Sequence, residues 1–398
     1  MKPPIELAEA QARLLAMARP LAAEEIGAEK ALGRCLAAPL TARRTQPSAD
    51  LSAMDGYAVT AGEPGPWRLV GESAAGHPFA GTLGAGEAVR ISTGAPMPDG
   101  AGAILLQENA AREREQVALN GEGDPTARHI RRKGFDFSQG DTVLDAGTRI
   151  GPAQLALAIA AGNATLPIRR RARLAILDSG DELASDPAEC APHQIPASNG
   201  AMIAAMAGGL ARDIHRLGPV PDRLDAVTAA LEAAAEADII VTSGGASVGD
   251  HDLIRPALEE WGAEIDFWRV AMKPGKPLLV ARKGEQIILG LPGNPVSSYV
   301  TAFLFLLPLL RALAGDAHPL PDVMQLTLGD DLPPTGARLE FIRAVRAGGM
   351  VSPVNEQDSS ALRALAASNA LIRRDIHSPA AMRGEMVNAY LLANGGIA

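Results

Sequence analysis

Cysteine and aromatic side chains are scarce in this sequence. Its 398 residues include two cysteines, Cys35 and Cys190, and only 3% are Phe, Trp or Tyr. Two thiols in so long a chain do not make a disulfide framework, and the absence of a CxxC pair argues against structural zinc. Because 47% of the residues are hydrophobic, the cores must be aliphatic, which is typical of a globular protein and argues against disorder.

Features that would direct the chain to nucleic acid or to a membrane are also missing. The formal net charge is −9, which leaves room only for a local basic pocket that binds a small anion. The N-terminus has no basic region followed by an apolar core, so we expect no signal peptide. Residues 296–313 are strongly apolar, but the uninterrupted run 302–307 ends at Pro308, whereas a spanning helix needs roughly 20 such residues. We therefore predict a buried core helix in a cytoplasmic protein that contacts neither nucleic acid nor membrane.

The N-terminal 170 residues change in texture along the chain. The first forty have apolar residues at helical spacing (Leu7, Ala10, Leu14) and predict two short helices. Short β-like runs such as 67–70 and 103–106 then alternate with turn residues, which indicates a small β-rich domain. A strand around 142–150, a helix at 152–161 and a basic linker at 169–171 follow.

The segment from about 172 to 316 has a different rhythm. Three short apolar runs, 174–177, 238–241 and 286–289, are each followed by a glycine-bearing polar loop and a helical pattern. Strands that alternate with helices predict βαβ units and a largely parallel sheet. Beyond Pro319 and Pro321 the chain returns to short strands and turns, which indicates a small barrel or sandwich.

The predicted fold is therefore a multidomain α/β protein. A central three-layer α/β domain is flanked by a β-rich N-terminal insertion domain and a small C-terminal β-barrel. The predicted boundaries are 1–45 together with 137–170 for a linker domain, 46–136 for the β-rich domain, 171–318 for the α/β domain and 319–398 for the barrel.

Three loops should carry the chemistry, because ligands bind outside the carboxyl ends of the strands of an open parallel sheet. In loop 242–250 (TSGGASVGD), three glycines allow backbone N–H groups to approach an anion, although a tight turn with positive φ explains the glycines equally well. Loop 291–298 (LPGNPVSS) places Ser297 and Ser298 at a helix start, where serines bind an oxyanion or, more commonly, cap the helix.

Charged residues near these loops extend the picture. Asp181 and Glu182 in the first loop, 179–183, suit Mg²⁺ with phosphates completing its shell, and capping of the next helix is the alternative. Lys273 and Lys276 flank a Pro-Gly turn that lets both reach one anion, with exposed surface lysines as the alternative. Asp252 is a better candidate than His251 for metal or proton chemistry. The sequence contains no GxxxxGK[ST] loop, which argues against a P-loop NTPase.

The motifs together resemble those of the molybdopterin molybdenumtransferases (MoeA and the E-domain of gephyrin). The likeness covers nearly the whole chain in matching order and spacing, and the segments that carry it are 51–59 (LSAMDGYAV), 92–96, 179–183, 242–250, 272–277 (MKPGKP) and 291–298.

This resemblance implies an elongated homodimer that inserts molybdate into adenylylated molybdopterin, releases AMP and requires Mg²⁺. It assigns the pterin and its phosphate to Gly244, Gly245, Ser247, Pro292, Gly293, Asn294, Pro295 and Ser297. It assigns the binding of molybdate to Lys273, Lys276, Arg338 and Ser359. It places acidic active-site residues at Asp222, Asp252 and Glu182, of which Asp252 and Glu182 hold the metal. Asp55 and Thr93 lie on the β-rich domain that, in this family, reaches the active site of the partner subunit.

Two other functions compete with this interpretation. A molybdopterin adenylyltransferase has a similar α/β domain but does not need the N-terminal half or the barrel. A gephyrin-like scaffold needs no intact anion site, and contacts with other proteins of cofactor biosynthesis are compatible with either role. Phe135 stands where many relatives carry Glu, which leaves the role of Asp136 open.

Overall fold

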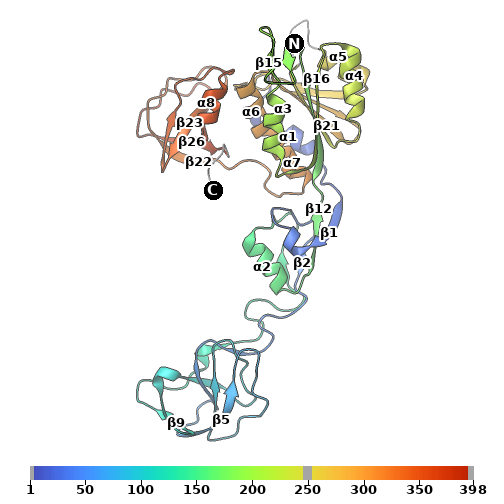
Figure 1. The fold of residues 1–398 in the computed structure, drawn as a ribbon. Helices are drawn as coiled ribbons and strands as arrows, with labels where there is room; N and C mark the ends of the chain where they lie inside the picture. Colours follow the sequence, from blue (N-terminus) through green and yellow to red (C-terminus); the bar gives the residue numbers. More distant parts are fainter. Residues whose placement is uncertain (1–3, 245–252, 393–398) are drawn as a thin grey trace. The chain divides into compact units, whose positions relative to one another are not determined.

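The computed structural model describes residues 4–244 and 253–392. The chain forms two compact units (Figure 1). The first unit contains residues 1–24 and 169–398, and the second contains residues 25–168.

A six-stranded sheet forms the centre of the first unit. Its order is β16 (Ala211–Val220), β13 (Ala172–Ser179), β17 (Ile239–Ser243), β21 (Gln286–Leu291), β20 (Leu279–Lys283) and β18 (Glu264–Trp268). The first four strands are parallel, and β20 runs antiparallel to both β21 and β18. The three apolar runs recognised in the sequence are β13, β17 and β21, which lie side by side, so their carboxyl ends share one edge.

Helices cover both faces of this sheet (Figure 1). One face carries α1 (Leu7–Met17), α3 (Asn199–Ala207), α6 (Pro295–Thr301), η4 (Ala302–Leu306) and α7 (Leu307–Leu313). The other carries α4 (Leu224–Ala233) and α5 (Ile254–Glu260). Alternate residues of β13 point to opposite sides, so that Ile176 packs in the first layer and Leu177 in the second. The predicted three-layer arrangement is confirmed.

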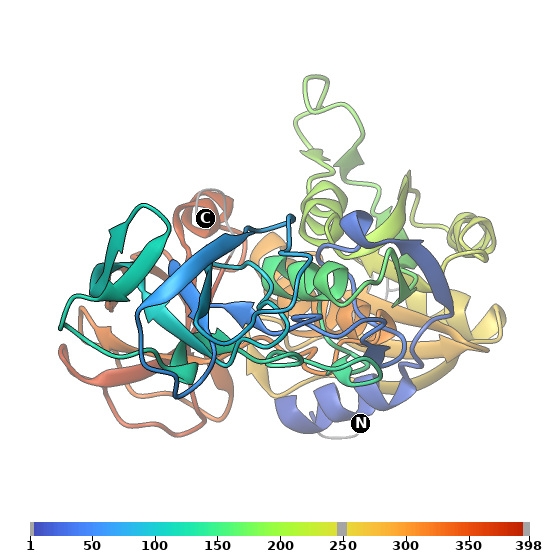
Figure 2. The same cartoon turned by 90° about the horizontal axis from the view of Figure 1, so that it is seen from below.

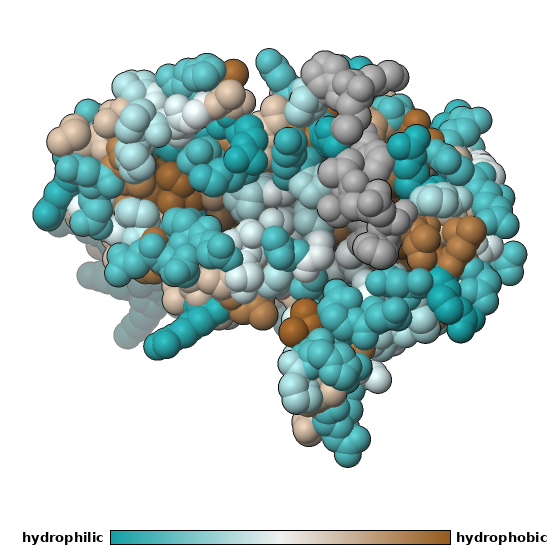
Figure 3. All heavy atoms as spheres, turned by 90° about the horizontal axis from the view of Figure 1, so that it is seen from above, coloured by the Kyte–Doolittle hydropathy of each residue, from teal (hydrophilic) through white to brown (hydrophobic). Residues whose placement is uncertain are grey.

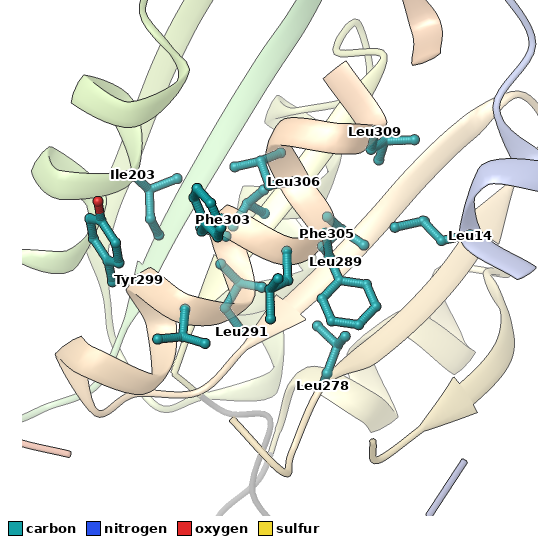
Figure 4. Close-up of a cluster of buried hydrophobic side chains, with 14 of the residues drawn as sticks. Leu14, Ile203, Leu278, Leu289, Leu291, Tyr299, Phe303, Phe305, Leu306 and Leu309 are labelled. Carbon is teal, nitrogen blue, oxygen red and sulfur yellow. The ribbon is translucent and has the colours of Figure 1, made fainter. Parts of the chain in front are cut away.

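The continuous helix Pro295–Leu313 forms the centre of the larger core. Within the described residues it is the one helix long and apolar enough to span a membrane, but 83% of its most apolar stretch is buried inside the protein, as predicted for a core helix. Figure 4 shows Phe303, Phe305 and Leu306 packed among Leu289 and other apolar side chains of the sheet and the neighbouring helices.

A closed five-stranded barrel follows. Its strands are β23 (Leu339–Ala347), β24 (Met350–Pro353), β22 (Met324–Leu328), β26 (Met386–Leu391) and β25 (Ala370–Arg374), with β25 pairing back to β23. The short strand β19 (Met272–Lys273) adds to β23 in parallel, and α8 (Leu362–Ala367) lies between β24 and β25 in the chain. Tyr390 of β26 meets Phe303 edge-on at 5.8 Å between ring centroids, so the barrel shares the larger core. The predicted barrel is confirmed.

The second unit contains another six-stranded sheet, drawn in blue and teal in Figure 2. Its order is β7 (Ala103–Leu106), β4 (Gly56–Val59), β6 (Glu87–Ile91), β5 (Trp67–Ser73), β9 (Gln116–Leu119) and β8 (Ala110–Glu113). The predicted strands at 67–70 and 103–106 are therefore present.

The remaining elements of the chain are β1 (Ala23–Gly27), η1 (Ala28–Lys30), β2 (Leu40–Thr41), β3 (Leu51–Ser52), η2 (Gln107–Asn109), η3 (Ala127–His129), β10 (Ile130–Arg131), β11 (Thr142–Leu144), α2 (Pro152–Ala160), β12 (Thr165–Arg169), β14 (Leu183–Ala184) and β15 (Ile195–Pro196).

One predicted helix is wrong. The second helix expected in the first forty residues is replaced by strand β1 and a short 3-10 turn. β1 pairs with β12, and a partner so far along the chain overrides the helical propensity of Ala and Glu. The predicted four-domain boundaries stay a prediction.

Candidate active site

A pocket of about 850 Å³ lies at the carboxyl ends of β13, β17 and β21; we call it the sheet-edge pocket. Figure 3 views the molecule from the side on which these strands end, and its centre is pale, which marks residues of intermediate hydropathy. Eight of the residues predicted for the site line the pocket: Glu182, Asp222, Gly244, Pro292, Gly293, Asn294, Pro295 and Ser297. Gly245, Ser247 and Asp252 lie outside the described residues.

Gly244 joins the three strand ends. Its φ of +98° is in the region that favours glycine, and a Cβ here would lie 2.7 Å from the carbonyl oxygen of Ser179. Its backbone N–H donates to the carbonyl oxygen of Leu291 at 3.3 Å. The tight-turn explanation therefore holds for Gly244, and the same turn brings its backbone to the pocket wall.

Acidic side chains occupy the rim beside β13. The Ser179 hydroxyl donates to Asp222 Oδ1 at 3.1 Å, and the Asp222 N–H donates to Asp181 Oδ1 at 3.1 Å. These contacts fix the first loop against the turn that begins α4. Strand β14 follows the first loop, and the next helix, α3, has Ser198 as its N-cap residue, so the alternative that the acids of this loop cap the next helix is wrong. The light-green loop between β14 and β15 extends away from the sheet (Figure 2).

The carboxylates of the sheet-edge pocket suit a magnesium ion whose remaining ligands come from the substrate. The described residues contain no group of three or more His, Cys, Asp or Glu side chains that could hold a metal by themselves. Glu182 and Asp222 nevertheless line one pocket and are both exposed. Mg²⁺ in proteins is commonly held by one or two carboxylates together with substrate phosphates, so this set fits Mg²⁺ only with a phosphorylated ligand present.

The third loop joins the sheet to the barrel. Asn294 is the N-cap residue of α6, so neither Ser297 nor Ser298 caps the helix. The Asn294 side-chain amide donates to Ser359 Oγ at 2.9 Å, and the Val296 N–H donates to the Ser359 carbonyl oxygen at 3.1 Å. These two bonds hold the barrel loop that carries Ser359 against the start of α6.

A second pocket, of about 710 Å³, adjoins the first; we call it the lysine pocket. It contains all four residues predicted to bind molybdate: Lys273, Lys276, Arg338 and Ser359. Lys273 stands opposite Glu340 in the β19–β23 pairing, with Nζ 3.6 Å from Glu340 Oε1. The Lys273 side chain is 55% exposed, so this ion pair contributes little and leaves the ammonium available.

The two pockets share a wall and differ in charge. Pro277 and Ser297 line both of them. The described lining of the sheet-edge pocket includes Asp178, Glu182 and Asp222 but no Lys or Arg, whereas the lysine pocket is lined by three cationic side chains together with Asp331, Glu340 and Asp358. The first is thus suited to a divalent cation and hydrogen-bond donors, and the second to an anion.

Asp55 and Thr93 lie together in the second unit. The Thr93 backbone N–H and its hydroxyl donate to Asp55 Oδ1 at 2.6 Å and 3.0 Å. These donors hold the pKa of the Asp55 carboxyl below its usual value, so it is ionised near neutral pH. Phe135 is 77% exposed, and the role of Asp136 stays open.

Comparisons with known proteins find matches along nearly the whole chain. Three family profiles match in order: "MoeA N-terminal region (domain I and II)" over residues 5–162, "Probable molybdopterin binding domain" over 175–312, and "MoeA C-terminal region (domain IV)" over 325–392. The molybdopterin molybdenumtransferase of Bacillus subtilis (strain 168) is 33% identical over 387 residues, which cover 93% of this chain and 90% of the relative.

The chain belongs to the molybdopterin molybdenumtransferase family. Molybdopterin molybdenumtransferase 2 of Mycobacterium tuberculosis (strain ATCC 25618 / H37Rv) is 35% identical over 359 residues, covering 86% of this chain and 88% of the relative. The crystal structure of the molybdopterin biosynthesis moeA protein from Pyrococcus horikoshii OT3 superposes with a TM-score of 0.85 at 26% identity, covering 98% of this chain and 100% of that one. The predicted family, enzyme class and fold class are confirmed.

Some residues of the candidate site were not predicted. Asp178 is buried in the lining of the sheet-edge pocket, and its signal was available, since it directly follows the apolar run of β13. The Asn199 side-chain amide donates to the Gly293 carbonyl oxygen at 2.7 Å. No local pattern indicates that contact, because the two residues are far apart in the chain.

Arg343 organises the barrel loop that reaches both pockets. It is 1% exposed, and its guanidinium donates to the carbonyl oxygens of Glu356, Asp358 and Ala361 at 3.0, 2.9 and 3.2 Å. Burial lowers the pKa of Arg343, opposed by the charges of Glu356 and Asp358. The held loop, residues 354–361, carries Ser359 into the lysine pocket and Ser360 into the sheet-edge pocket.

Proposed function

We propose that this enzyme inserts molybdate into adenylylated molybdopterin and releases AMP. The observation that carries the proposal is the wall shared by an acidic pocket at the strand ends and a pocket beside it that gathers Lys273, Lys276 and Arg338. A substrate with a phosphoanhydride, and a separate oxyanion that must meet it, need two such adjoining sites. Membership of the family supports the same reaction.

The sheet-edge pocket binds the adenylylated pterin in this proposal. Backbone groups around Gly244 and the loop from Pro292 to Ser297 line it, and Gly245 and Ser247 are predicted to join them. Glu182, with Asp252 and Asp222, would hold Mg²⁺, which neutralises charge on the phosphoanhydride and on the departing AMP. The exposed position of Glu182 and Asp222 leaves room for phosphate oxygens and water around the ion.

The lysine pocket binds molybdate. Molybdate is a dianion that loses hydration on binding, and Lys273, Lys276 and Arg338 offset that cost with charge-assisted hydrogen bonds. The Ser359 hydroxyl, already fixed by Asn294, is positioned to donate to the same anion. Because Ser297 lines both pockets, molybdate is held next to the group that receives it, so anhydride cleavage depends on molybdate.

Two further features belong to the proposal. The active form is a homodimer in which Asp55 and Thr93 act at the site of the partner subunit. Its support is the likeness of segment 51–59 to the family. A cytoplasmic location stays a prediction.

AMP release from adenylylated molybdopterin, with Mg²⁺ present and molybdate titrated, tests the reaction. Release that rises with molybdate, together with formation of the cofactor, is the expected result. No release, with adenylylation of free molybdopterin by ATP, would instead make the protein an adenylyltransferase. Absence of both activities would leave the scaffold role.

The lysines give a sharper test. Replacement of Lys273 and Lys276 together by alanine should lower molybdate-dependent turnover by about 10²–10⁴-fold, because each lost charge-assisted contact is worth about 1.5–3 kcal/mol. Steady-state AMP release against molybdate concentration measures this. Lys283→Ala is the matched control, since Lys283 stacks on the Trp261 ring at 3.6 Å and lines neither pocket. Full activity in the double variant would contradict the assignment.

A further inference from the structure

Asp178 is a buried carboxylate for which the proposed reaction gives no role. It precedes the last residue of β13, lines the sheet-edge pocket, and is 4% exposed. Burial of a carboxylate is costly unless hydrogen-bond donors surround it. A buried acid in a ligand pocket therefore needs a partner.

Its partners within the described chain are few. The backbone N–H of Gly200 donates to the Asp178 carboxylate, and the Arg216 guanidinium lies at 3.9 Å from Oδ2, on a side chain that is 48% exposed. An ionised carboxylate offers about four acceptor positions, so one N–H and one distant guanidinium leave acceptor capacity unused. Burial outweighs both partners and raises the pKa of Asp178.

The structure reserves space for this carboxylate. A Cβ at position 200 would overlap the Asp178 carboxylate oxygens, so glycine is required at the start of α3 for the acid to occupy its place. Gly200 is itself buried in α3. The absence of a side chain at position 200 therefore makes room for the Asp178 carboxylate in the wall of the pocket.

The position of Asp178 separates it from the other pocket acids. Glu182 and Asp222 are exposed at the rim, where water and phosphate can complete a cation shell. Asp178 is withdrawn from solvent, which suits neutral N–H donors. The 2-amino-4-oxopyrimidine edge of a pterin presents two adjacent donors, the ring N3–H and the 2-amino N–H, in the parallel arrangement that a carboxylate accepts from guanidinium groups. The amino edge of adenine pairs its donor with a ring acceptor, so a carboxylate there discriminates against it.

We propose that Asp178 is a specificity-determining residue that accepts both N–H groups of the 2-amino-4-oxopyrimidine edge of the substrate. The pterin end of the substrate then lies inward at Asp178, and the adenylyl end lies toward the acidic rim. This inference rests on the proposed function for the identity of the heterocycle.

Binding of two free pteridines to the full-length protein tests it. Pterin carries the 2-amino group, and lumazine carries an oxygen at that position, which would face the carboxylate as a second acceptor. Fluorescence titration should give the wild-type protein at least tenfold tighter binding of pterin than of lumazine. Asp178→Asn, which retains an acceptor for the Gly200 N–H, should reduce that preference to about twofold or less.

The controls separate recognition from folding. Asp213→Asn removes a half-exposed acid on β16 that lines neither pocket and should retain the wild-type preference. A purely structural role for Asp178 would weaken both ligands equally in Asp178→Asn, and that result would overturn the inference. Equal binding of pterin and lumazine by the wild-type protein would overturn it too, without recourse to any variant.

The two proposals fail separately. Molybdate-dependent AMP release in a protein that does not distinguish pterin from lumazine would overturn the role of Asp178 alone. A pterin preference that depends on Asp178, in a protein that releases no AMP, would support this inference and count against the proposed reaction.

Discussion

The residues opposite the active site stabilise the sheet through a half-buried ion pair. Arg170 donates through both Nη atoms to the two oxygens of Asp238, each at 2.7 Å, and the Arg173 backbone N–H donates to Asp238 at 2.7 Å. Burial alone would raise the pKa of Asp238, but these hydrogen bonds and the charges of Arg170 and Arg173 outweigh it and lower the pKa. The pair joins the entry to β13 with the residue just before β17.

The lowered pKa of Asp238 sets the sign of a pH effect. A carboxyl whose pKa is lower in the folded state stabilises the fold above its unfolded pKa, 3.8 for Asp238, and loses that contribution as pH falls through its folded pKa. Asp238→Asn should therefore lower the free energy of unfolding at pH 7 by about 1–3 kcal/mol, and the difference from wild type should shrink as pH falls below about 4.

Urea unfolding of both proteins between pH 7 and pH 3 measures this difference. Glu236→Gln is the control, because Glu236 is 91% exposed beside Arg173 and such pairs contribute little. A difference between Asp238→Asn and wild type that stays constant down to pH 3 would show that the carboxyl does not act through its charge.

At the scale of elements, strand β23 and the loop 354–361 act together. Besides the three bonds from Arg343, the Gln357 side-chain amide donates to the carbonyl oxygens of Arg343 and Val354 at 3.0 and 2.8 Å. A barrel strand thereby fixes the loop that brings Ser359 to Asn294. We expect molybdate affinity to depend on Arg343, although Arg343 does not line either pocket.

Arg343→Lys tests this positioning role. A lysine retains the charge but cannot reach three carbonyl oxygens as a planar fork does, so the loop loses at least one of its three bonds. The KM for molybdate should rise about tenfold, equivalent to about 1.4 kcal/mol, with a smaller change in the KM for the adenylylated pterin. Arg346→Lys on the same strand should leave both constants unchanged, because the Arg346 side chain donates to the Gly348 carbonyl oxygen at an exposed site. An equal rise of both constants in Arg343→Lys would indicate general loosening of the barrel instead.

The same elements show why sequence analysis succeeded in part. β13, β17 and β21 are central strands. Because both of their faces are buried, each appears in the sequence as a continuous apolar run. Within the described residues β16 pairs only with β13. As an edge strand it carries exposed residues such as Arg212 and Asp213 and has no apolar run to recognise. The loops after the central strands could be predicted because parallel strands end at one edge.

Long-range burial was the part that the sequence did not reveal. Arg343 is an ordinary surface residue by type, and in the fold it is buried and donates to three carbonyl oxygens of loop 354–361. The meaning of Asp178 depends on Gly200, and nothing in the chain before folding shows that the two meet. The prediction of a second N-terminal helix was wrong for the same reason. β1 is a strand because it pairs with β12, which lies far along the chain.

At the scale of the whole molecule, the residues predicted for one reaction are divided between two compact units. Asp55 and Thr93 belong to the second unit, while both pockets belong to the first. If the active form is a homodimer with shared sites, as proposed, a defect in each of two different chains can be complemented within a mixed dimer. Such complementation has a definite stoichiometry.

Asp55→Ala and Lys276→Ala should each inactivate the homodimer and should complement each other. In a twofold-symmetric dimer with one chain of each kind, one shared site carries both changes and the other carries neither, so purified mixed dimers should regain about half of the wild-type activity per dimer. Co-expression with two affinity tags, tandem purification and molybdate-dependent AMP release measure this. Mixed dimers of Asp55→Ala with Thr93→Ala are the matched control, because both of their sites remain defective and no activity should return. Activity that stays absent in the first pair would mean that Asp55 and Lys276 serve the same chain, and the partner-subunit role of Asp55 would have to be abandoned.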